Sequence, residues 1–486
     1  MIRNGLYNVG GQTVRGAIGL FTIPFLIRFL GIREYGVWSL AYALLALMTM
    51  SEAGMSVAAA VFLSKDIAEG DSRATSETLS VVLLGAVLLA TVIGLFLLLG
   101  GSQVVRSVVA FSVSERAEAG RALRIAGLAV FVYIIERALV GIEQAFDRYA
   151  TINVLDVSQS LVGNVGLVVV AWLGGKTTAM MKWQLFAWAV LLSVHCLFVF
   201  RLLHLHHRMS LRWSANKARK ILRFSAAAWV SALGTAAFGQ CDRLVVGGVL
   251  GAPALGIYSA ITNMTSKINS FSGTAVQPLV PSLSRTATIG TSTEGQLKQA
   301  VHLNALIAIE AAVFLFVLAD WIMRVMVPGA SVPQNILGLQ IATIIYALYS
   351  FNAPGYFILF SVGAARTNAL VVLASGAASL GLIFLGSRYF GLIGALGGNV
   401  GYFGTLLLIV AGLRKTRVAV RRYLSWVALP CLWLAVAVGV GLVLRPYLQW
   451  RAIFCLVQAL LFVLWFVHYR RDSWMESKIR HPLPGN

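Results

Sequence analysis

The sequence predicts an all-α integral membrane protein with about fourteen transmembrane helices. Of its 486 residues, 58% are hydrophobic and only 12% are charged, and the mean hydropathy is +0.81. A soluble globular protein has about 25% charged residues, so this composition cannot provide an ordinary water-exposed surface. Apolar runs of spanning length recur from one end of the chain to the other. A β-barrel is excluded because these runs are too long for membrane strands and do not alternate.

Each predicted helix is an apolar run bounded by charged or Pro/Gly-rich connectors. About 20 apolar residues are needed to cross the hydrocarbon core of a bilayer. The connectors are all short, so no folded domain outside the membrane is expected. The predicted spans lie near residues 9–30, 36–63, 79–101, 123–146, 151–173, 182–204, 223–250, 256–283, 300–323, 337–361, 368–387, 390–412, 424–444 and 450–469.

The distribution of Lys and Arg predicts the orientation. The 39 Lys and Arg exceed the 18 Asp and Glu, for a net charge of +21. In a soluble chain this charge would suggest nucleic acid, but here the basic residues cluster in the connectors 201–223 and 414–422, as in cytoplasmic loops. With the N-terminus inside, the inner loops hold roughly twice as many Lys and Arg as the outer loops. We therefore predict a multi-pass protein with both termini in the cytoplasm and no nucleic-acid partner.

An internal repeat divides the chain into two halves. The first copy, at residues 30–39, reads Leu-Gly-Ile-Arg-Glu-Tyr-Gly-Val-Trp-Ser, and the second, at residues 250–259, reads Leu-Gly-Ala-Pro-Ala-Leu-Gly-Ile-Tyr-Ser, at an offset of 220 residues. Internal repeats of this kind are typical of transporters whose halves move against each other. The predicted parts are a six-helix bundle over 1–204, a basic cytoplasmic linker over 205–222, a second six-helix bundle over 223–412, a terminal helix pair over 424–469 and a cytoplasmic tail over 470–486.

The repeat belongs to a longer set of motifs. Residues 240–248 read Gln-Cys-Asp-Arg-Leu-Val-Val-Gly-Gly, and residues 394–397, after the eleventh span, read Gly-Ala-Leu-Gly. In this order and spacing, the motifs resemble the polysaccharide transporter (Wzx-like) flippases of the multidrug/oligosaccharidyl-lipid/polysaccharide exporter superfamily. The resemblance extends over about the first 415 residues.

The resemblance implies a MATE-like fold in the bacterial inner membrane, with two bundles around a central cavity and alternating access. It implies translocation of an undecaprenyl-pyrophosphate-linked oligosaccharide from the cytoplasmic to the periplasmic leaflet, for O-antigen or exopolysaccharide biosynthesis. The implied partners are this glycan, the lipid bilayer, and the polysaccharide polymerase and other assembly proteins. It implies neither a cofactor nor an enzymatic reaction.

Cations at mid-depth are the candidate substrate ligands. The expected head group is large, polar and anionic, and Arg or Lys can bind it through charge-assisted hydrogen bonds. A charged residue at the centre of a span costs about 2.5–3.5 kcal/mol on insertion scales, so it is a functional candidate by default. Polar residues at helical spacing mark one face of span one and one face of span eight. The candidate cavity residues on these faces and in span seven are Gln12, Arg15, Arg243, Asn263, Lys267 and Gln277.

Lys267 is the cation that most needs a polar partner. It lies about eleven residues, or roughly 16 Å, from the outer end of span eight, which makes snorkelling to the interface difficult. Span eight contains no acidic residue. Lys267 therefore requires either an acidic neighbour on another helix or an anionic substrate, and the sequence leaves both open. Arg15 lies near the cytoplasmic end of span one, where a cavity role and snorkelling are both open.

Carboxylates inside the spans are candidates for ion coupling or for ion pairs. Glu52, in the middle of span two, is expected to accept a proton or to pair with Arg15 or Lys267. Asp242 and Arg243 are expected to form a structural or gating pair, because the resembling families commonly have an Asp or Arg near this point.

A second acidic group is expected to be structural. Its members are Glu136, Arg137, Glu143 and Asp147 in span four and Asp156 in span five, which we expect to form an internal ion-pair network. The four cysteines form no Cys-x-x-Cys pair, so no metal site is predicted from them.

Two other functions remain as alternatives. A MATE-like drug or cation antiporter would need a net acidic cavity, whereas the mid-span charge in span eight is the cation Lys267. A polyprenyl-dependent membrane glycosyltransferase or polymerase would need metal-binding carboxylates or a long outer loop. The chain has no Asp-x-Asp and no such loop, so the enzyme is the weakest of the three hypotheses.

The predicted topology can be tested by labelling two connectors. A cysteine at Ser214 should react from the cytoplasm and a cysteine at Thr178 from the opposite side, because the connector at 205–222 holds five Lys or Arg and the connector at 174–181 holds one. Access to membrane-impermeant reagents in intact and opened cells measures this. Labelling of both cysteines from the same side would contradict the fourteen-span arrangement.

Overall fold

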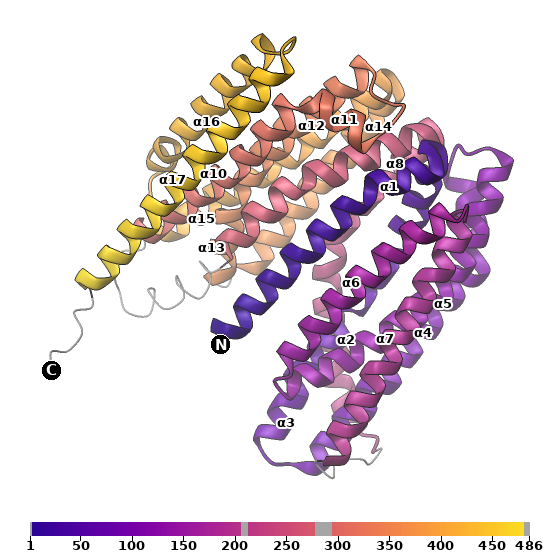
Figure 1. Cartoon of the computed structure of the whole chain (residues 1–486). Coiled ribbons are helices and arrows are strands. Elements are labelled where there is room, and N and C mark those ends of the chain that lie inside the picture. The colour runs from indigo at the N-terminus through magenta and orange to yellow at the C-terminus, as the bar shows by residue number, and fades with distance from the viewer. Residues whose placement is uncertain (1, 206–211, 278–293, 363, 481–486) are drawn as a thin grey trace. The chain divides into compact units, whose positions relative to one another are not determined.

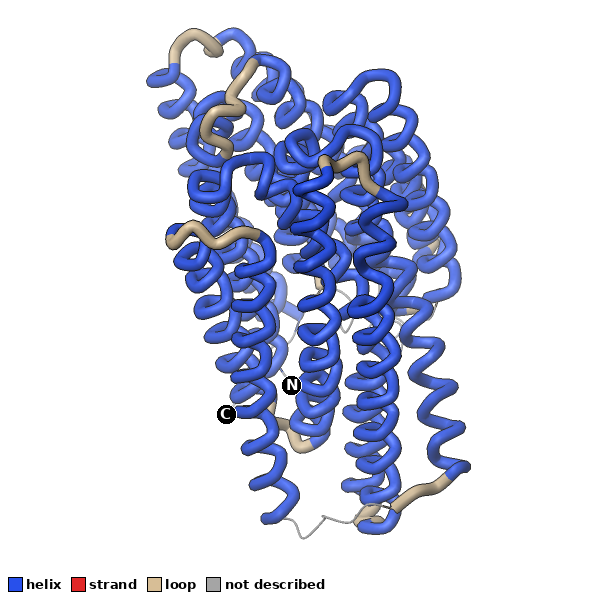
Figure 2. Tube along the Cα trace, turned by 90° about the vertical axis from the view of Figure 1, so that its right-hand side faces the viewer, coloured by secondary structure: helices blue, strands red, loops and turns tan. Residues whose placement is uncertain are grey.

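The computed structural model describes residues 2–205, 212–277, 294–362 and 364–480. Within these ranges the chain is helical and contains no strand (Figures 1 and 2). The helices are α1 (Ile2–Thr49), η1 (Met50–Glu52), α2 (Ala53–Ala58), η2 (Ala59–Leu63), α3 (Ser64–Ala68), α4 (Ser72–Val108), α5 (Val113–Ala145), α6 (Tyr149–Trp172), α7 (Thr177–Leu205), α8 (Ala215–Val276), α10 (Glu294–Val317), α11 (Ala319–Met326), α12 (Pro333–Tyr349), η3 (Ser350–Asn352), α13 (Ala353–Ser361), α14 (Ala365–Gly397), η4 (Gly398–Leu406), α15 (Leu407–Thr416), α16 (Val420–Val443) and α17 (Leu448–Arg480).

The helices match the predicted spans. In the described ranges, ten apolar helical segments are long enough to cross a membrane, and Leu448–Leu464 is a shorter apolar helix. Three of the ten are interrupted by a glycine with positive φ, at Gly31 in α1, Gly251 in α8 and Gly391 in α14. Each of these three holds two predicted spans, so the described helices account for all fourteen apolar runs. The all-helical membrane fold is confirmed.

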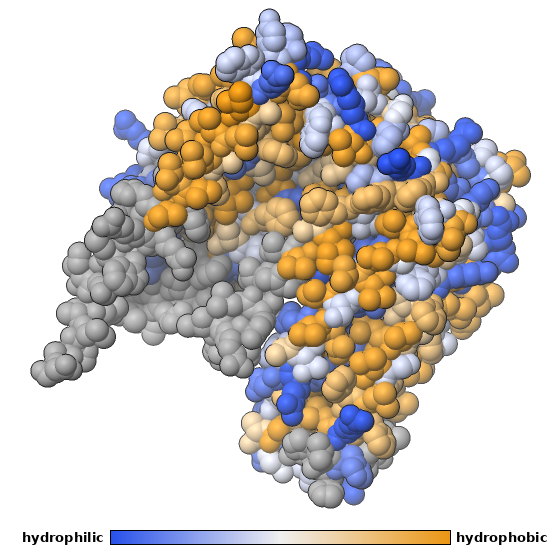
Figure 3. All heavy atoms as spheres, viewed as in Figure 1, coloured by the Kyte–Doolittle hydropathy of each residue, from blue (hydrophilic) through white to orange (hydrophobic). Residues whose placement is uncertain are grey.

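The sides of these helices are apolar where they are exposed. Figure 3 shows hydrophobic residues over large parts of the visible helix surfaces. On α4, the side chains of Leu88, Val92 and Leu99 are exposed by 66%, 66% and 77%. A water-soluble protein rarely exposes contiguous apolar surface of this extent. The surface therefore fits contact with lipid.

The chain forms two compact units. The first consists of Met1–Met264, Arg324–Gly338 and Ala369–Gly404, and the second of Thr265–Met323, Leu339–Asn368 and Thr405–Asn486. Both copies of the repeat lie in the first unit, and the terminal helices α16 and α17 lie in the second. The two six-helix halves expected from the repeat remain a prediction.

The repeated motif creates two matching helix breaks. Gly31 has φ 76° and ψ 159°, and Gly251 has φ 80° and ψ −176°. These backbone conformations are readily accessible only to glycine, because a Cβ would clash with the backbone. The first glycine of each copy therefore ends one helix and lets the next begin in a new direction.

The second glycine of each copy brings the two copies into contact. A Cβ at Gly36 would lie 1.9 Å from the carbonyl oxygen of Ala252, and a Cβ at Gly256 would lie 2.3 Å from the carbonyl oxygen of Ile32. The contact is reciprocal, since residues 32 and 252 and residues 36 and 256 are equivalent in the two copies. Such a contact is the signature of a two-fold relation, here within one chain. Close backbone approach through small residues is a common way for membrane helices to pack.

In the first unit, α5 packs against α4 and α7. At Gly94 and Gly127 the backbones of α4 and α5 approach so closely that a Cβ at Gly127 would lie 2.5 Å from the carbonyl oxygen of Gly94. Further along these helices lies an apolar cluster that includes Leu79, Ile142 and Val199 of α4, α5 and α7. These contacts hold α5 in a fixed rotation, which determines where its charged side chains point.

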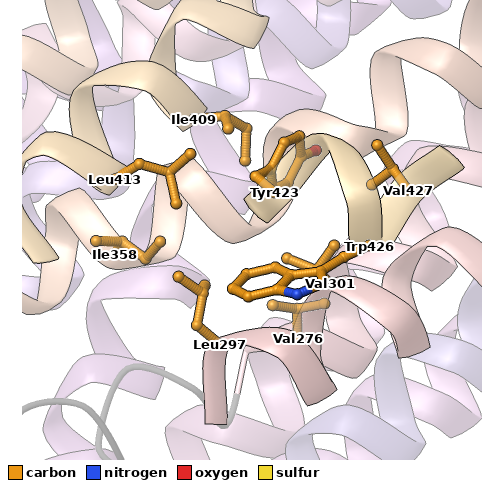
Figure 4. Close-up of a cluster of buried hydrophobic side chains, with 9 residues drawn as sticks. All are labelled: Val276, Leu297, Val301, Ile358, Ile409, Leu413, Tyr423, Trp426 and Val427. Atoms are coloured by element: carbon orange, nitrogen blue, oxygen red, sulfur yellow. The ribbon is translucent and has the colours of Figure 1, made fainter. Parts of the chain in front are cut away.

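In the second unit, the terminal helices are packed into the core. Figure 4 shows Tyr423, Trp426 and Val427 of α16 in a buried cluster with residues of α8, α10, α13 and α15. Helix α17 is held by Arg451, whose side chain is 5% exposed. Its guanidinium donates to Asp320 Oδ2 at 2.9 Å and to the carbonyl oxygen of Val317 at 3.2 Å. The terminal pair is therefore an integral part of this unit.

Replacing Gly36 by alanine should destabilise the protein. The new Cβ has no space beside Ala252, and the neighbouring atom is backbone that cannot rotate away. We expect a loss of about 1–3 kcal/mol, as for other overpacked sites. Gly19→Ala is the matched control in the same helix, because no atom lies within 4 Å of its Cβ position. Thermal unfolding in detergent measures both variants, and equal melting temperatures would contradict the close contact.

Candidate functional site

A network of charged side chains lies among the helices of the first unit. Arg137 of α5 donates from Nε to Glu136 Oε2 at 2.7 Å, and from NH2 to Glu136 Oε1 at 2.8 Å and Asp156 Oδ1 at 2.7 Å. Arg15 of α1 donates to the other oxygen, Asp156 Oδ2, at 2.9 Å. Asp156 of α6 therefore accepts hydrogen bonds from two arginines. We call these residues, together with Glu143 and His195, the ionic network.

His195 of α7 extends the network to a second carboxylate of α5. Its Nδ1 lies 2.7 Å from Glu143 Oε1 and its Nε2 lies 3.3 Å from Glu136 Oε1. Glu136 and Glu143 are two helical turns apart, so both lie on one face of α5. The side chains of His195, Glu136 and Glu143 are 0%, 1% and 2% exposed. The imidazole thus lies between two buried carboxylates.

Aromatic rings lie beside the guanidinium of the network. The Cζ atom of Arg137 is 5.5 Å from the ring centroid of Tyr133, which suits a cation–π contact. The Tyr133 ring in turn lies 4.7 Å from the ring of Trp188 on α7, between centroids. These rings shield one side of Arg137 and reduce its access to water.

A second polar cluster joins residues of α8 that precede the second repeat copy to residues at and just after its end. Arg243 donates to Gln240 Oε1 at 2.5 Å and to Asn263 Oδ1 at 2.6 Å. Asp242 instead accepts from the hydroxyl of Tyr258 at 3.0 Å. Asp242 and Arg243 are adjacent in sequence but direct their side chains to different partners, since successive helical residues do not face each other. Both side chains are buried.

The structure gives partners to some of the predicted site residues. Arg15, one of the two cations considered as partners of Glu52, is paired with Asp156. Glu52 is buried, and its Oε2 has no hydrogen-bond partner among the described residues. Of the expected ion-pair group, Glu136, Arg137, Glu143 and Asp156 belong to the network. Asp147 lies just after α5 with φ 59° and is outside it.

The remaining predicted cavity residues lie in or next to α8, except for Gln12 in α1. Lys267 is half-buried in the second unit, and Asn263 lies one turn before it in α8. Gln277 is exposed just beyond the end of α8. The Gln12 side chain lies outside the described part of the structure, although its backbone belongs to α1. These residues stay predictions for the substrate site.

His195 is not among the site residues predicted from the sequence. The missed signal is a histidine in the middle of the apolar run 182–204, because an ionisable residue in a span is a functional candidate by default. The seven-residue spacing of Glu136 and Glu143 is a second signal, since it places two carboxylates on one helix face. Which helix supplies the residue between them cannot be read from either pattern.

The first unit also has a pocket of about 460 Å³ at the break in α1. Acidic and basic side chains line it together, including Arg33, Glu115 and Glu118, beside the glycines at 174 and 175. Arg33 Nε lies 3.0 Å from Glu115 Oε1, and the backbone amide of Thr178 donates to Glu118 at 2.8 Å. The first contact joins α1 to α5, and the second joins the start of α7 to α5.

The family model of the polysaccharide biosynthesis proteins matches residues 25–329. The chain belongs to this family. A protein of Shigella flexneri named "Putative O-antigen transporter" is 19% identical over 401 residues, which are 81% of this chain and 93% of that protein. The resemblance given by the sequence motifs is thereby confirmed.

Solved structures show the same fold. The lipid II flippase MurJ, in an inward closed conformation, has a TM-score of 0.72 at 13% identity, over 97% of this chain and 99% of that chain. An inward-facing multidrug resistance MATE family transporter of the MOP superfamily has a TM-score of 0.65 at 14% identity, over 85% and 95%. Family and fold are those of a membrane transporter. The MATE-like fold predicted from the motifs is confirmed.

Removing the central cation of the network should destabilise this transporter. Arg137→Met leaves Glu136 buried without its guanidinium partner, and breaking such a pair costs about 3–5 kcal/mol. Arg73→Met is the control, because Arg73 is 76% exposed in its ion pair with Glu77 and exposed pairs contribute about 1 kcal/mol or less. Thermal unfolding in detergent compares the two. A similar small effect of both substitutions would show that Glu136 does not depend on Arg137.

Proposed function

We propose that this transporter is a flippase that moves an undecaprenyl-pyrophosphate-linked oligosaccharide from the cytoplasmic to the periplasmic leaflet of the bacterial inner membrane. The translocation serves O-antigen or exopolysaccharide biosynthesis and proceeds by alternating access. The observation that carries the proposal is the combination of family and fold. The family is that of polysaccharide biosynthesis proteins, and the fold follows a lipid II flippase over 97% of the chain, including the terminal helices.

The chemistry of the substrate supports a cationic site. A pyrophosphate carries several negative charges, and a buried Arg or Lys binds phosphate through charge-assisted hydrogen bonds. Of the three predicted cations, Arg15 already shares Asp156 with Arg137. We expect Arg243 and Lys267 to contribute most to binding, because a cation within a span is a functional candidate by default. Arg243 has a side-chain nitrogen, Nε, without a hydrogen-bond partner among the described residues, so it retains capacity for an acceptor.

A drug or cation antiporter is the second candidate. The observation in its favour is a local acidic surplus within the first unit, where the four carboxylates of Glu52, Glu136, Glu143 and Asp156 lie near two arginines. A cationic substrate would be attracted to such a surplus. Export assays with a lipid-linked glycan and with cationic dyes distinguish the two functions directly.

Lys267→Ala should abolish glycan export while the protein reaches normal abundance in the membrane. Lys267→Arg should retain part of the export, because the positive charge that binds pyrophosphate is kept. Surface glycan in a strain that lacks the chromosomal copy measures export, and immunoblotting of membranes measures abundance. Lys298→Ala is the control, since Lys298 is an exposed lysine of α10 in the same unit.

The double variant Lys267→Ala/Glu52→Ala separates binding from structure. If Lys267 only neutralised Glu52, each single substitution would lower abundance and the double substitution would restore it, because a buried charge is costly mainly when it is unpaired. Restored export in the double variant would contradict a role of Lys267 in binding. Full export by a well-expressed Lys267→Ala protein would remove this residue from the site.

A further inference from the structure

His195 lies between two carboxylates in a place that water does not reach. Its two ring nitrogens are 2.7 Å from Glu143 Oε1 and 3.3 Å from Glu136 Oε1, and its side chain has no exposed surface. A neutral imidazole has one N–H donor and one lone pair. Nε2 has no hydrogen-bond partner among the described residues, so the hydrogen bond of the ring is the one that joins Nδ1 to Glu143. A neutral imidazole supplies only this one hydrogen bond to the Glu143 carboxylate, which has no Arg or Lys among its described side-chain contacts.

The surroundings of Glu143 call for one additional proton. Its Oε1 is in contact with His195, and its Oε2 is buried without a hydrogen-bond partner among the described residues. A buried carboxylate that received only one hydrogen bond from a neutral donor would be strongly destabilising. Two arrangements avoid this cost. The proton either makes His195 an imidazolium, or it resides on Glu143 and is donated to Nδ1.

The charge count of the whole network agrees with one added proton. The charged groups joined to His195 through the ionic network are Glu136, Arg137 and Glu143 of α5, Asp156 of α6 and Arg15 of α1. Two further titratable groups, Tyr133 of α5 and Glu52 of η1, lie near the network. Arg137 and Arg15 balance Glu136 and Asp156, so Glu143 is balanced only when the Glu143–His195 pair holds the proton. Glu52 lies outside the ionic network and is not part of this count.

We infer that His195, Glu136 and Glu143 form a buried proton-binding site and that the proton bound there is exchanged during the transport cycle. The second part rests on the proposed transport function. The proton adds to the Glu143–His195 pair when water reaches the site and leaves when the helices rearrange. Release leaves one uncompensated negative charge beside Glu136, which weakens the present arrangement of α5 and α7. Proton exchange and helix movement are thereby linked.

Nuclear magnetic resonance of the full-length protein with ¹⁵N-labelled histidine tests for the proton. In detergent at about pH 8.5, where exposed histidines are neutral, one histidine should still show two protonated nitrogens. The signal should vanish in His195→Gln and persist in His204→Gln, the matched control, because His204 is an exposed histidine of the same helix. If the proton resides on Glu143, the carboxylic-acid infrared band lost in Glu143→Gln should show it instead. Absence of both signals would overturn the proton site.

Glycan export in cells tests the role in transport. Export by the wild-type protein and by His204→Gln should fall when an ionophore collapses the proton gradient, whereas His195→Gln should export at least tenfold less at equal abundance. Unchanged export by His195→Gln would overturn the exchange of this proton during transport. If the wild-type protein exported no lipid-linked glycan at all, the proposed function would fail, while the spectroscopic result would stand on its own.

Discussion

The absence of water inside the bilayer is the constraint on which this structure depends. Backbone polar groups cannot be left open there, so every described span is a helix. The same constraint applies to side chains, since a charge among apolar helices must find an opposite charge. Each of the two units contains such a buried pairing of opposite charges. In the first, Arg137 and Arg15 converge on Asp156, and in the second, Arg451 of α17 binds Asp320.

Helices that cross a membrane must also be redirected at defined points, and the repeat shows how the chain achieves this. One glycine in each copy has a backbone conformation that ends a helix, and a second glycine, five residues later, lets the next helix touch its counterpart. The two functions require different properties of the same residue type. Gly31 is needed for its positive φ, and Gly36 for its missing side chain. Keeping both in each copy preserves the reciprocal contact.

Much of the fold could be predicted from the sequence, because span length and apolar composition depend on the bilayer and not on tertiary detail. The helix breaks coincide with Gly31 and Gly251, which the repeat had already marked. Partner choice across helices could not be predicted in the same way. Arg15 pairs with Asp156 and not with Glu52, because a partner depends on the rotation and tilt of helices far apart in sequence. His195 was overlooked for the same reason, since its importance comes only from the two carboxylates of α5.

The shared carboxylate of Asp156 connects the proton site to α1. Arg137 divides its donors between Glu136 and Asp156, and Asp156 also accepts from Arg15. A negative charge gained near Glu136 draws Arg137 more strongly toward it and leaves Asp156 more available to Arg15. Such effects extend over several ångströms, because charges are poorly screened in a medium of low dielectric constant. Helix α1 carries both Arg15 and the glycine contact between the repeats. The part of α1 before Gly31 therefore carries a charge of the network, and the part after Gly31 carries the place where the two repeat copies meet.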